Sequence, residues 1–235
     1  MNGPVHELTA ELASDRPEDG AILRRLHQRL ATAAGLQGVL DVTYRTLDTP
    51  VGSLLLAGTP VGLVRIAFAE QGHDRVLDDL AQRVGPRILA DARALDTVVR
   101  ELEEYFAGTR RRFDLPLDHR LISGFRAVVL AQLPRIDYGH TASYAQVAQA
   151  AGNPGAVRAV GSACGANPLP IVVPCHRVVR SDGSPGGYAG GPAAKKVLLA
   201  LESAAGSAAG SAAGSAAESA ANPAAESAAE SVTGG

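Results

Sequence analysis

Hydrophobic and polar residues alternate with two different periods in the first half of the chain. Within residues 18–34, apolar side chains recur at helical spacing, which predicts a short amphipathic helix packed on the body of the protein through Ile22, Leu23, Leu26 and Leu30. Residues 40–69 form three β-rich runs separated by Pro and Gly turns, which predicts an antiparallel meander. Two helical segments follow, and the second is expected to end with Gly108 as its C-cap. Residues 38–118 therefore predict a small α+β domain, in which we find no candidate chemistry and expect a scaffold.

The next stretch is predicted to be mostly helical. One helix is expected at residues 120–134, stopped by Pro134. Ser143 is predicted to cap a second helix, and Asn153 with Pro154 to begin a third that ends at Gly165. Two short helices joined by a tight turn are typical of a helix-turn-helix, although such pairs also occur as plain packing units.

The last of these helices is unusual because most of its side chains are small. Arg158 is its one long cation, among Ala156, Ala159, Gly161, Ser162 and Ala163. A helix that reads base edges in the major groove usually presents several long polar side chains. Small residues instead allow close approach to a nucleic-acid backbone or a narrow groove, or close packing between helices.

The end of the chain has a different composition. From Ala204 the sequence cycles in alanine-rich tetrads with Gly, Ser or Glu and has almost no large apolar residues. This composition predicts a disordered low-complexity tail at residues 203–235. The predicted organisation is an extension at 1–37, the α+β domain at 38–118, a helix-turn-helix domain at 119–202, and the tail.

Composition and charge narrow the possible environments and partners. The 235 residues include only two cysteines, too few for a disulfide framework, which favours a reducing cytoplasm. The N-terminus is polar and acidic, unlike a signal peptide, and no apolar run is long enough to span a membrane. Residues 119–200 carry eight Lys and Arg against two Asp and Glu. Such a basic segment is either a solubilising face or the footprint of a nucleic-acid binder.

The sequence "VVPCHRVV" places a thiol beside an imidazole inside an apolar run at residues 172–179. Burial there would raise the pKa of Cys175 and make it inert, so a reactive thiol needs a base. His176 is the candidate base, but neighbours on an extended run point to opposite faces, so a bridging water is expected between them. Glu202, on a helical run that can fold back, is the carboxylate available to orient the imidazole. A Cys–His dipeptide by itself is most often structural.

Two loops flank this run. Asn167 lies in the Pro-rich segment "ANPLP" before it, and Tyr188 lies in the Gly-rich segment "SDGSPGGYAGG" after it. Glycines allow close backbone approach to a ligand, and an aromatic ring offers a stacking face. Both segments are also compatible with ordinary surface turns.

Together, "SYAQVAQAAGNPGAVRAVGSA", "NPLPIVVPCHRVVRSDGSPGGYAGG" and "KKVLLALE" resemble the O6-alkylguanine-DNA alkyltransferases, the methylated-DNA–protein-cysteine methyltransferases. The strong match covers residues 120–202, and residues 40–118 fit the family's N-terminal domain more loosely. The resemblance implies a mixed α+β fold with an antiparallel N-terminal sheet and a helix-turn-helix catalytic domain. It implies irreversible, single-turnover transfer of an alkyl group from O6-alkylguanine in double-stranded DNA to the protein's own cysteine.

The resemblance also implies a role for individual residues. Cys175 accepts the alkyl group from a flipped-out guanine, His176 acts through a water as base, and Glu202 orients it. Asn167 holds its loop against the active-site turn, and Tyr144 assists nucleotide rotation and protonation of the leaving guanine. The implied substrate and DNA contacts come from Arg158 as the finger that fills the vacated stack, Tyr188 as a pocket wall, the carbonyls of Cys175 and Val178, the N–H of Ala189, and the small helix surface at Ala156, Ala159 and Gly161.

No metal or other cofactor is expected, and the N-terminal zinc ligands of some relatives are missing. Cys164 is expected to be a small buried residue. We expect a cytoplasmic monomer with no membrane partner. The rival hypotheses are a helix-turn-helix regulator with a redox-sensing cysteine, and a cysteine hydrolase.

Overall fold

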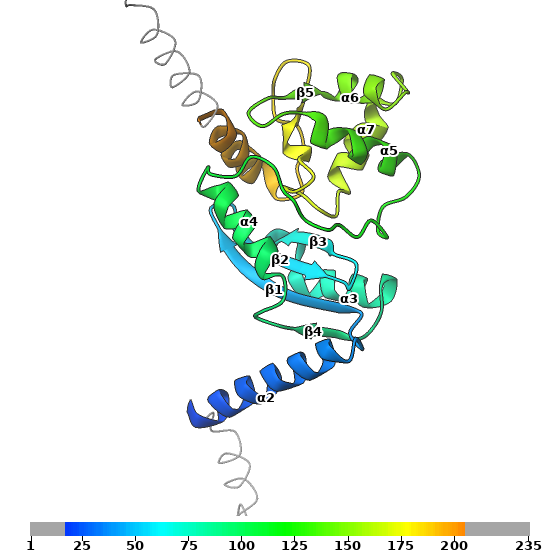
Figure 1. The fold of residues 1–235 in the computed structure, drawn as a ribbon. Helices are drawn as coiled ribbons and strands as arrows, with labels where there is room; N and C mark the ends of the chain where they lie inside the picture. Colours follow the sequence, from blue (N-terminus) through cyan, green and yellow to red (C-terminus); the bar gives the residue numbers. More distant parts are fainter. Residues whose placement is uncertain (1–16, 205–235) are drawn as a thin grey trace, which may run out of the picture.

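The computed structural model describes residues 17–204, so residues 1–16 and nearly all of the predicted tail lie outside the described residues. A four-stranded sheet forms the N-terminal domain (Figure 1). The strands β1 (Val42–Thr49), β2 (Gly52–Gly58) and β3 (Leu63–Phe68) pair antiparallel in sequence order, which confirms the predicted meander. A short strand that the pattern did not predict, β4 (Ile88–Ala90), pairs parallel with β1 and makes the order β3-β2-β1-β4, so the sheet is mixed rather than purely antiparallel.

Both faces of this sheet are buried, because a helix covers each of them. Alternate side chains of β2 and β3 point to opposite faces. Leu55, Ala57, Val64 and Ala67 pack in one apolar cluster with helix α3 (His73–Arg83). Leu54, Leu56, Ile66 and Phe68 pack in another with helix α4 (Asp96–Phe106) and with the C-terminal domain. The hydrophobic core is therefore continuous from the sheet into the C-terminal domain.

The C-terminal domain is mostly helical, as predicted. It contains α5 (Phe125–Gln132), α6 (Tyr144–Ala150), α7 (Val157–Gly165) and a final helix described over residues 191–204. The strands β5 (Ala142–Ser143) and β6 (Val178–Val179) pair in parallel. Single 3-10 turns lie at η1 (Ala69–Gln71), η2 (Leu133–Arg135) and η3 (Cys175–Arg177).

The ends of α6 and α7 test the predicted caps. Ser143 caps α6 as expected, since its hydroxyl accepts a hydrogen bond from the backbone N–H of Gln146 at 3.1 Å. The predicted start of α7 at Asn153 and Pro154 is wrong. The carbonyl of Asn153 closes a turn by accepting from the N–H of Ala156 at 3.0 Å, and α7 begins only at Val157, with Ala156 as its N-cap.

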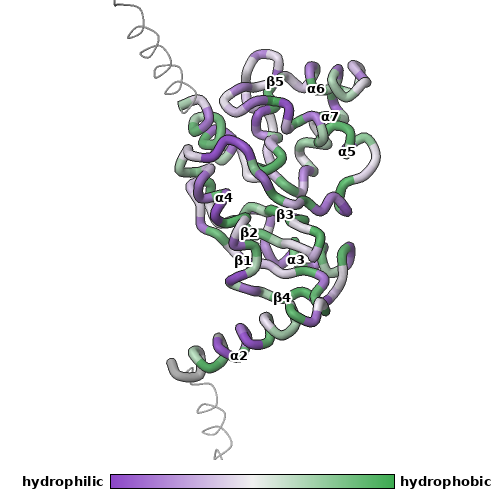
Figure 2. Tube along the Cα trace, viewed as in Figure 1, coloured by the Kyte–Doolittle hydropathy of each residue, from purple (hydrophilic) through white to green (hydrophobic). Residues whose placement is uncertain are grey.

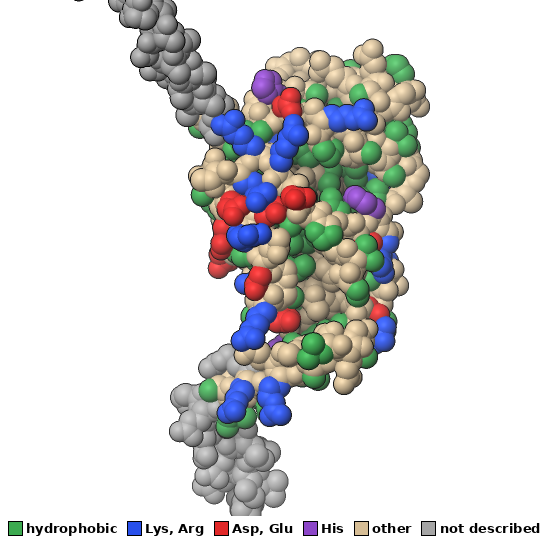
Figure 3. Space-filling view, viewed as in Figure 1, with side chains coloured by type: hydrophobic (Ala, Val, Ile, Leu, Met, Phe, Trp, Pro, Cys, Tyr) green, Lys and Arg blue, Asp and Glu red, His purple; other side chains and the backbone are tan. Residues whose placement is uncertain are grey.

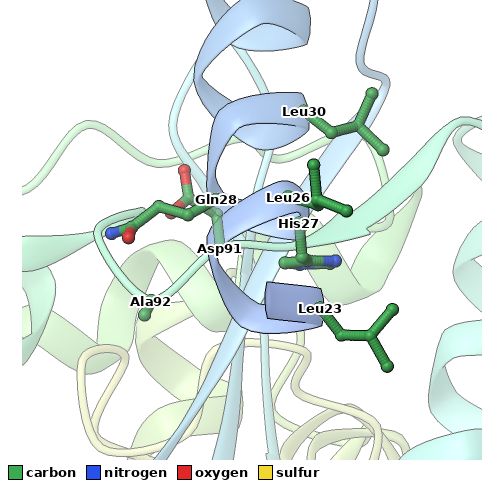
Figure 4. A pocket seen from close by; sticks show the side chains of 7 residues that line it. All are labelled: Leu23, Leu26, His27, Gln28, Leu30, Asp91 and Ala92. Carbon is green, nitrogen blue, oxygen red and sulfur yellow. The ribbon is translucent and has the colours of Figure 1, made fainter. Parts of the chain in front are cut away.

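The predicted N-terminal helix is present as α2 (Pro17–Leu36), but its predicted packing is wrong. Figure 2 shows apolar and polar segments alternating along it. Leu23, Leu26 and Leu30 project from one side of the helix and are 52–63% exposed (Figure 4). The helix instead contacts the sheet edge through Ala31 and Ala34, which are buried, and through His27, whose Nε2 lies 2.5 Å from the carbonyl oxygen of Ala90 in β4. Small alanine side chains allow this close approach, and the leucine side of the helix is left uncovered by the described residues.

None of the described helices is long and apolar enough to cross a membrane. On the face drawn in Figure 3, acidic side chains gather in the middle of the view near α4, and the lobe that holds α5, α6 and α7 shows few of them. This distribution agrees with the excess of Lys and Arg in residues 119–200.

Candidate active site

Cys175 lies in a 3-10 turn and not in the extended run that the sequence suggested. The N–H of Arg177 donates to the carbonyl of Pro174 at 3.0 Å and closes this turn, so that only Val178 and Val179 are extended. Cys175 is 1% exposed and His176 is fully buried. The expectation that neighbours point to opposite faces, which depended on an extended backbone, therefore does not apply here.

Asn167 connects the Pro-rich loop to this turn. Its side-chain amide donates to the carbonyl of Val173 at 2.8 Å and to Cys175 Sγ at 3.1 Å, and its Oδ1 accepts from the N–H of Leu169 at 3.0 Å. Asn167 is 3% exposed, so these hydrogen bonds satisfy a buried amide. The arrangement holds the thiol in place and gives its sulfur a hydrogen-bond donor.

His176 and Glu202 form a buried pair from distant parts of the chain. His176 Nε2 lies 2.8 Å from Glu202 Oε1, and Glu202 is 1% exposed. Burial alone would raise the pKa of Glu202, but hydrogen bonds from His176 and Arg177 and their charges outweigh it and lower the pKa to about 2. An ionised carboxylate only accepts hydrogen bonds, so Nε2 carries the proton. His176 Nδ1 is then the basic nitrogen, and it is buried with no hydrogen-bond partner among the described residues.

The protonation of both groups follows from their burial. Burial lowers the pKa of His176 below its usual value, despite the opposing effect of Glu202, which keeps the imidazole neutral. Burial raises the pKa of Cys175 to about 11, although the hydrogen bond from Asn167 and the charge of Lys195 act in the opposite direction. The site therefore holds a neutral thiol and a neutral imidazole.

Lys195 is a charged neighbour of this site that the sequence reasoning missed. Its side chain is fully buried, and Nζ donates to the carbonyl of Val178 at 2.5 Å and lies 5.9 Å from the ring centroid of Tyr144. Its position three residues before Leu198 and seven before Glu202, on one face of the helical run, was the only sequence signal, and it does not distinguish a buried Lys from a surface one.

Tyr105 is a second residue that the sequence reasoning missed, and it comes from the domain expected to be only a scaffold. Its hydroxyl donates to Glu202 Oε1 at 2.7 Å and lies 3.4 Å from His176 Nε2. Tyr105 belongs to the apolar stripe of α4 with Val98 and Leu102. A buried tyrosine hydroxyl usually finds a hydrogen-bond partner, which was the only sequence signal.

Two tyrosines and two glycines surround the thiol turn. Tyr188 stands between the domains, with its ring centroid 5.5 Å from that of Phe68 in β3 and 6.4 Å from that of His176. A Cβ on Gly190 would lie 2.5 Å from the Phe68 ring, and one on Gly186 would lie 2.6 Å from the Tyr144 hydroxyl. Both glycines are therefore required for close approach of the Gly-rich loop. Three of the residues predicted to contact the base lie here. Ala189 and Tyr188 are half-buried, and the carbonyl of Val178 already accepts a hydrogen bond from Lys195.

The small-residue helix presents its predicted contact residues to solvent. Arg158 and Ala159 on α7 are exposed, and Gly161 and Ala156 are half-exposed. Val160, Ala163 and Cys164 face the core, which confirms the expected burial of Cys164.

The structure therefore brings together Cys175, His176, Glu202, Asn167, Tyr144 and Tyr188, and leaves Arg158 exposed on α7. Among residues 17–204, no group of three or more His, Cys, Asp or Glu side chains could hold a metal ion.

Comparison with known proteins places the chain in a family. Residues 42–119 match the model of the 6-O-methylguanine DNA methyltransferase ribonuclease-like domain, and residues 124–204 match that of its DNA-binding domain. The methylated-DNA–protein-cysteine methyltransferase of Mycolicibacterium paratuberculosis is 43% identical over 161 residues, which cover 68% of this chain and 92% of the relative. The chain belongs to the methylated-DNA–protein-cysteine methyltransferase family. The resemblance of the cysteine motif to this family is thereby confirmed.

Further members agree with this assignment. The constitutive methylated-DNA–protein-cysteine methyltransferase of Bacillus subtilis is 38% identical, over 66% of this chain and 92% of the relative. The crystal structure of Mycobacterium tuberculosis OGT in complex with DNA superposes with a TM-score of 0.61 at 40% identity, over 69% of this chain and 94% of that chain. The protein is therefore a DNA-repair methyltransferase that transfers an alkyl group to its own cysteine. Helix α2 precedes the segments that match the family.

Proposed function

We propose that Cys175 is the acceptor and takes the alkyl group from O6 of a guanine in duplex DNA. The observation that carries this proposal is the buried set of Cys175, His176 and Glu202, in which Nε2 of the imidazole is committed to the carboxylate and Nδ1 is left as the base. The other cysteine, Cys164, is also buried, but its pKa is raised to about 12, chiefly by burial, and no imidazole contacts it among the described residues.

The reaction is a single displacement at a saturated carbon. The sulfur–carbon bond forms as the carbon–O6 bond breaks, and the thiol proton passes through a water to His176 Nδ1. The leaving guanine takes a proton from Tyr144, whose hydroxyl lies against the Gly-rich loop. The product is a thioether, which no step hydrolyses, so each molecule reacts once.

The burial of the thiol supports a flipped-out substrate. Cys175 is 1% exposed, so a base stacked inside a duplex cannot bring O6 to its sulfur. The base must leave the stack and enter between Tyr188, Tyr144 and the thiol turn, which costs a few kcal/mol. We assign Arg158 to the vacated position, because its side chain is exposed on α7. The small residues at the exposed side of α7, which are Ala159, the half-exposed Gly161 and the half-exposed N-cap Ala156, would let that helix approach the minor groove closely.

The same proposal includes a monomer acting in the cytoplasm. Support comes from the two free thiols, since a nucleophilic cysteine has to stay reduced.

The test is intact-mass analysis after incubation with a duplex that carries one O6-methylguanine. Wild type and Cys164→Ser, the matched control, should each gain one methyl group, located by peptide mapping on Cys175. Cys175→Ser should gain none but still bind the duplex, because a hydroxyl is scarcely ionised near neutral pH. A methyl group on Cys164, or several turnovers per molecule as expected of a hydrolase, would overturn the proposal. A redox-sensing regulator would gain no methyl group at all.

A further inference from the structure

The catalytic carboxylate is shared between the two domains. Glu202 accepts five hydrogen bonds from described residues, and four of these come from the C-terminal domain, through His176, Arg177 and the N–H of Gly139. The fifth comes from the hydroxyl of Tyr105 on α4, 97 residues away in sequence. Oε1 accepts from Tyr105, from His176 and from Nη2 of Arg177, so the phenol, the imidazole and the guanidinium share one oxygen.

The position of this hydroxyl is set by a packed aromatic cluster. The ring of Tyr105 is fully buried, with centroid distances of 5.4 Å to Phe106, 5.3 Å to Phe113 and 6.1 Å to Tyr138. Burial and the charge of Glu202 raise the pKa of Tyr105, so its hydroxyl keeps its proton and donates it. The cluster gives the phenol no freedom to turn away from the carboxylate.

Tyr138 provides an internal comparison in the same cluster. Its hydroxyl is buried without a hydrogen-bond partner among the described residues, although its ring packs edge-on against Tyr105. The two tyrosines share one aromatic cluster, but only the hydroxyl of Tyr105 reaches Glu202, while the half-buried ring of Tyr138 lies against Arg111 and Arg177.

We propose that Tyr105 is a positioning residue of the alkyl-transfer site, through which the N-terminal domain holds Glu202 and tunes the basicity of His176. This inference rests on the proposed roles of Cys175 and His176. A hydrogen bond from the phenol to Oε1 draws negative charge away from the imidazole, because the oxygen shares its lone pairs among three donors, which are Tyr105, His176 and Arg177. Loss of the phenol leaves more charge facing His176, which favours the imidazolium and raises the pKa of His176.

Other groups also act on the imidazole and stay unchanged in the test. The titratable and charged groups that neighbour His176 or act on it, besides Tyr105, are Glu202, Lys195, Arg177, Tyr188 and the adjacent Cys175. None of them is altered by replacing Tyr105 with Phe, so a change in the pH profile reports the phenol itself.

The experiment compares Tyr105→Phe with Tyr138→Phe in single-turnover transfer from free O6-benzylguanine, followed by intact mass as a function of pH. Tyr105→Phe should slow transfer about tenfold, as expected for loss of one hydrogen bond to a charged group. The acid limb of its pH–rate profile should also move to higher pH. Tyr138→Phe should match wild type in both respects.

A purely structural role for Tyr105 would lower the yield of folded protein but leave the acid limb where it is. If Tyr105→Phe is too unstable to assay, 3-fluorotyrosine incorporated at residue 105 keeps the ring and makes the hydroxyl a stronger donor, so the limb should move to lower pH. The inference would be overturned if the pH–rate profiles of Tyr105→Phe and of the 3-fluorotyrosine variant both coincide with that of wild type. Absence of transfer in wild type would instead refute the proposed function, which keeps the two failures distinct.

Discussion

Replacing Glu202 with Gln tests the proposed roles of Cys175, His176 and Glu202 at the residue that accepts the most hydrogen bonds. The carboxylate is 1% exposed and accepts five hydrogen bonds, including two from the guanidinium of Arg177 at 2.9 Å. Glutamine preserves the shape but removes the charge, and its NH₂ group would face donors instead of acceptors. The buried guanidinium then loses its counter-charge, and His176 Nε2–H loses its anionic acceptor.

The magnitude follows from the pKa of Glu202. Hydrogen bonds and charge from His176 and Arg177 outweigh burial and lower it from an ordinary 4.5 to about 2. At about 1.4 kcal/mol per pKa unit, this corresponds to about 3 kcal/mol of stability. Because the folded-state pKa is depressed, that stability is fully present above pH 4.5 and is lost as pH falls through about 2. Removing one partner of a buried ion pair typically costs about 3–5 kcal/mol of stability, which agrees with the figure derived from the pKa of Glu202.

Urea unfolding of wild type and Glu202→Gln at a series of pH values measures this difference. We expect about 3 kcal/mol at neutral pH, shrinking as the wild-type carboxylate becomes protonated. Transfer should fall roughly 100-fold, the usual contribution of a positioned general base. The matched control is Glu101→Gln, another buried carboxylate that lies on α4 and accepts from the N–H of Asp114 at 2.9 Å. It should leave transfer unchanged. A stability difference that does not vary with pH, or a fully active Glu202→Gln, would refute the reasoning.

Two further predictions concern other parts of the site. Arg158→Ala should slow repair of duplex DNA at least about tenfold and leave the reaction with free O6-benzylguanine unchanged, because only the duplex has a base stack to fill. Equal losses on both substrates would contradict the proposal that Arg158 fills the vacated position in the stack. Asn167→Ala removes a donor 3.1 Å from Cys175 Sγ, so the pKa of the thiol should rise further above its already raised value of about 11. The pH dependence of iodoacetamide labelling in a Cys164→Ser background measures it, and an unchanged profile would contradict the assigned role.

The sequence by itself determined the elements whose signals are local. The β-rich runs between Pro and Gly turns specify β1, β2 and β3, and Ser143 with Gln146 specifies the start of α6 through a capping box that spans four residues. The motifs identified the family, and they contain six residues that the structure brings together, because those residues lie in short segments of characteristic order. In each case the information lies within a few residues of chain.

Only the tertiary structure decided which distant groups meet. The donor from Tyr105 to Glu202 spans 97 residues and depends on how α4 packs against the final helix, which no periodicity encodes. Lys195 looks like an ordinary surface residue in sequence, and the carbonyl of Val178, which accepts a hydrogen bond from its buried Nζ, comes from a distant segment. The leucine stripe of α2 predicts a helix but not what covers it, because amphipathicity states only that a face is apolar. Helical periodicity and caps are properties of neighbouring residues, whereas burial and pKa depend on which atoms fill the space around a group.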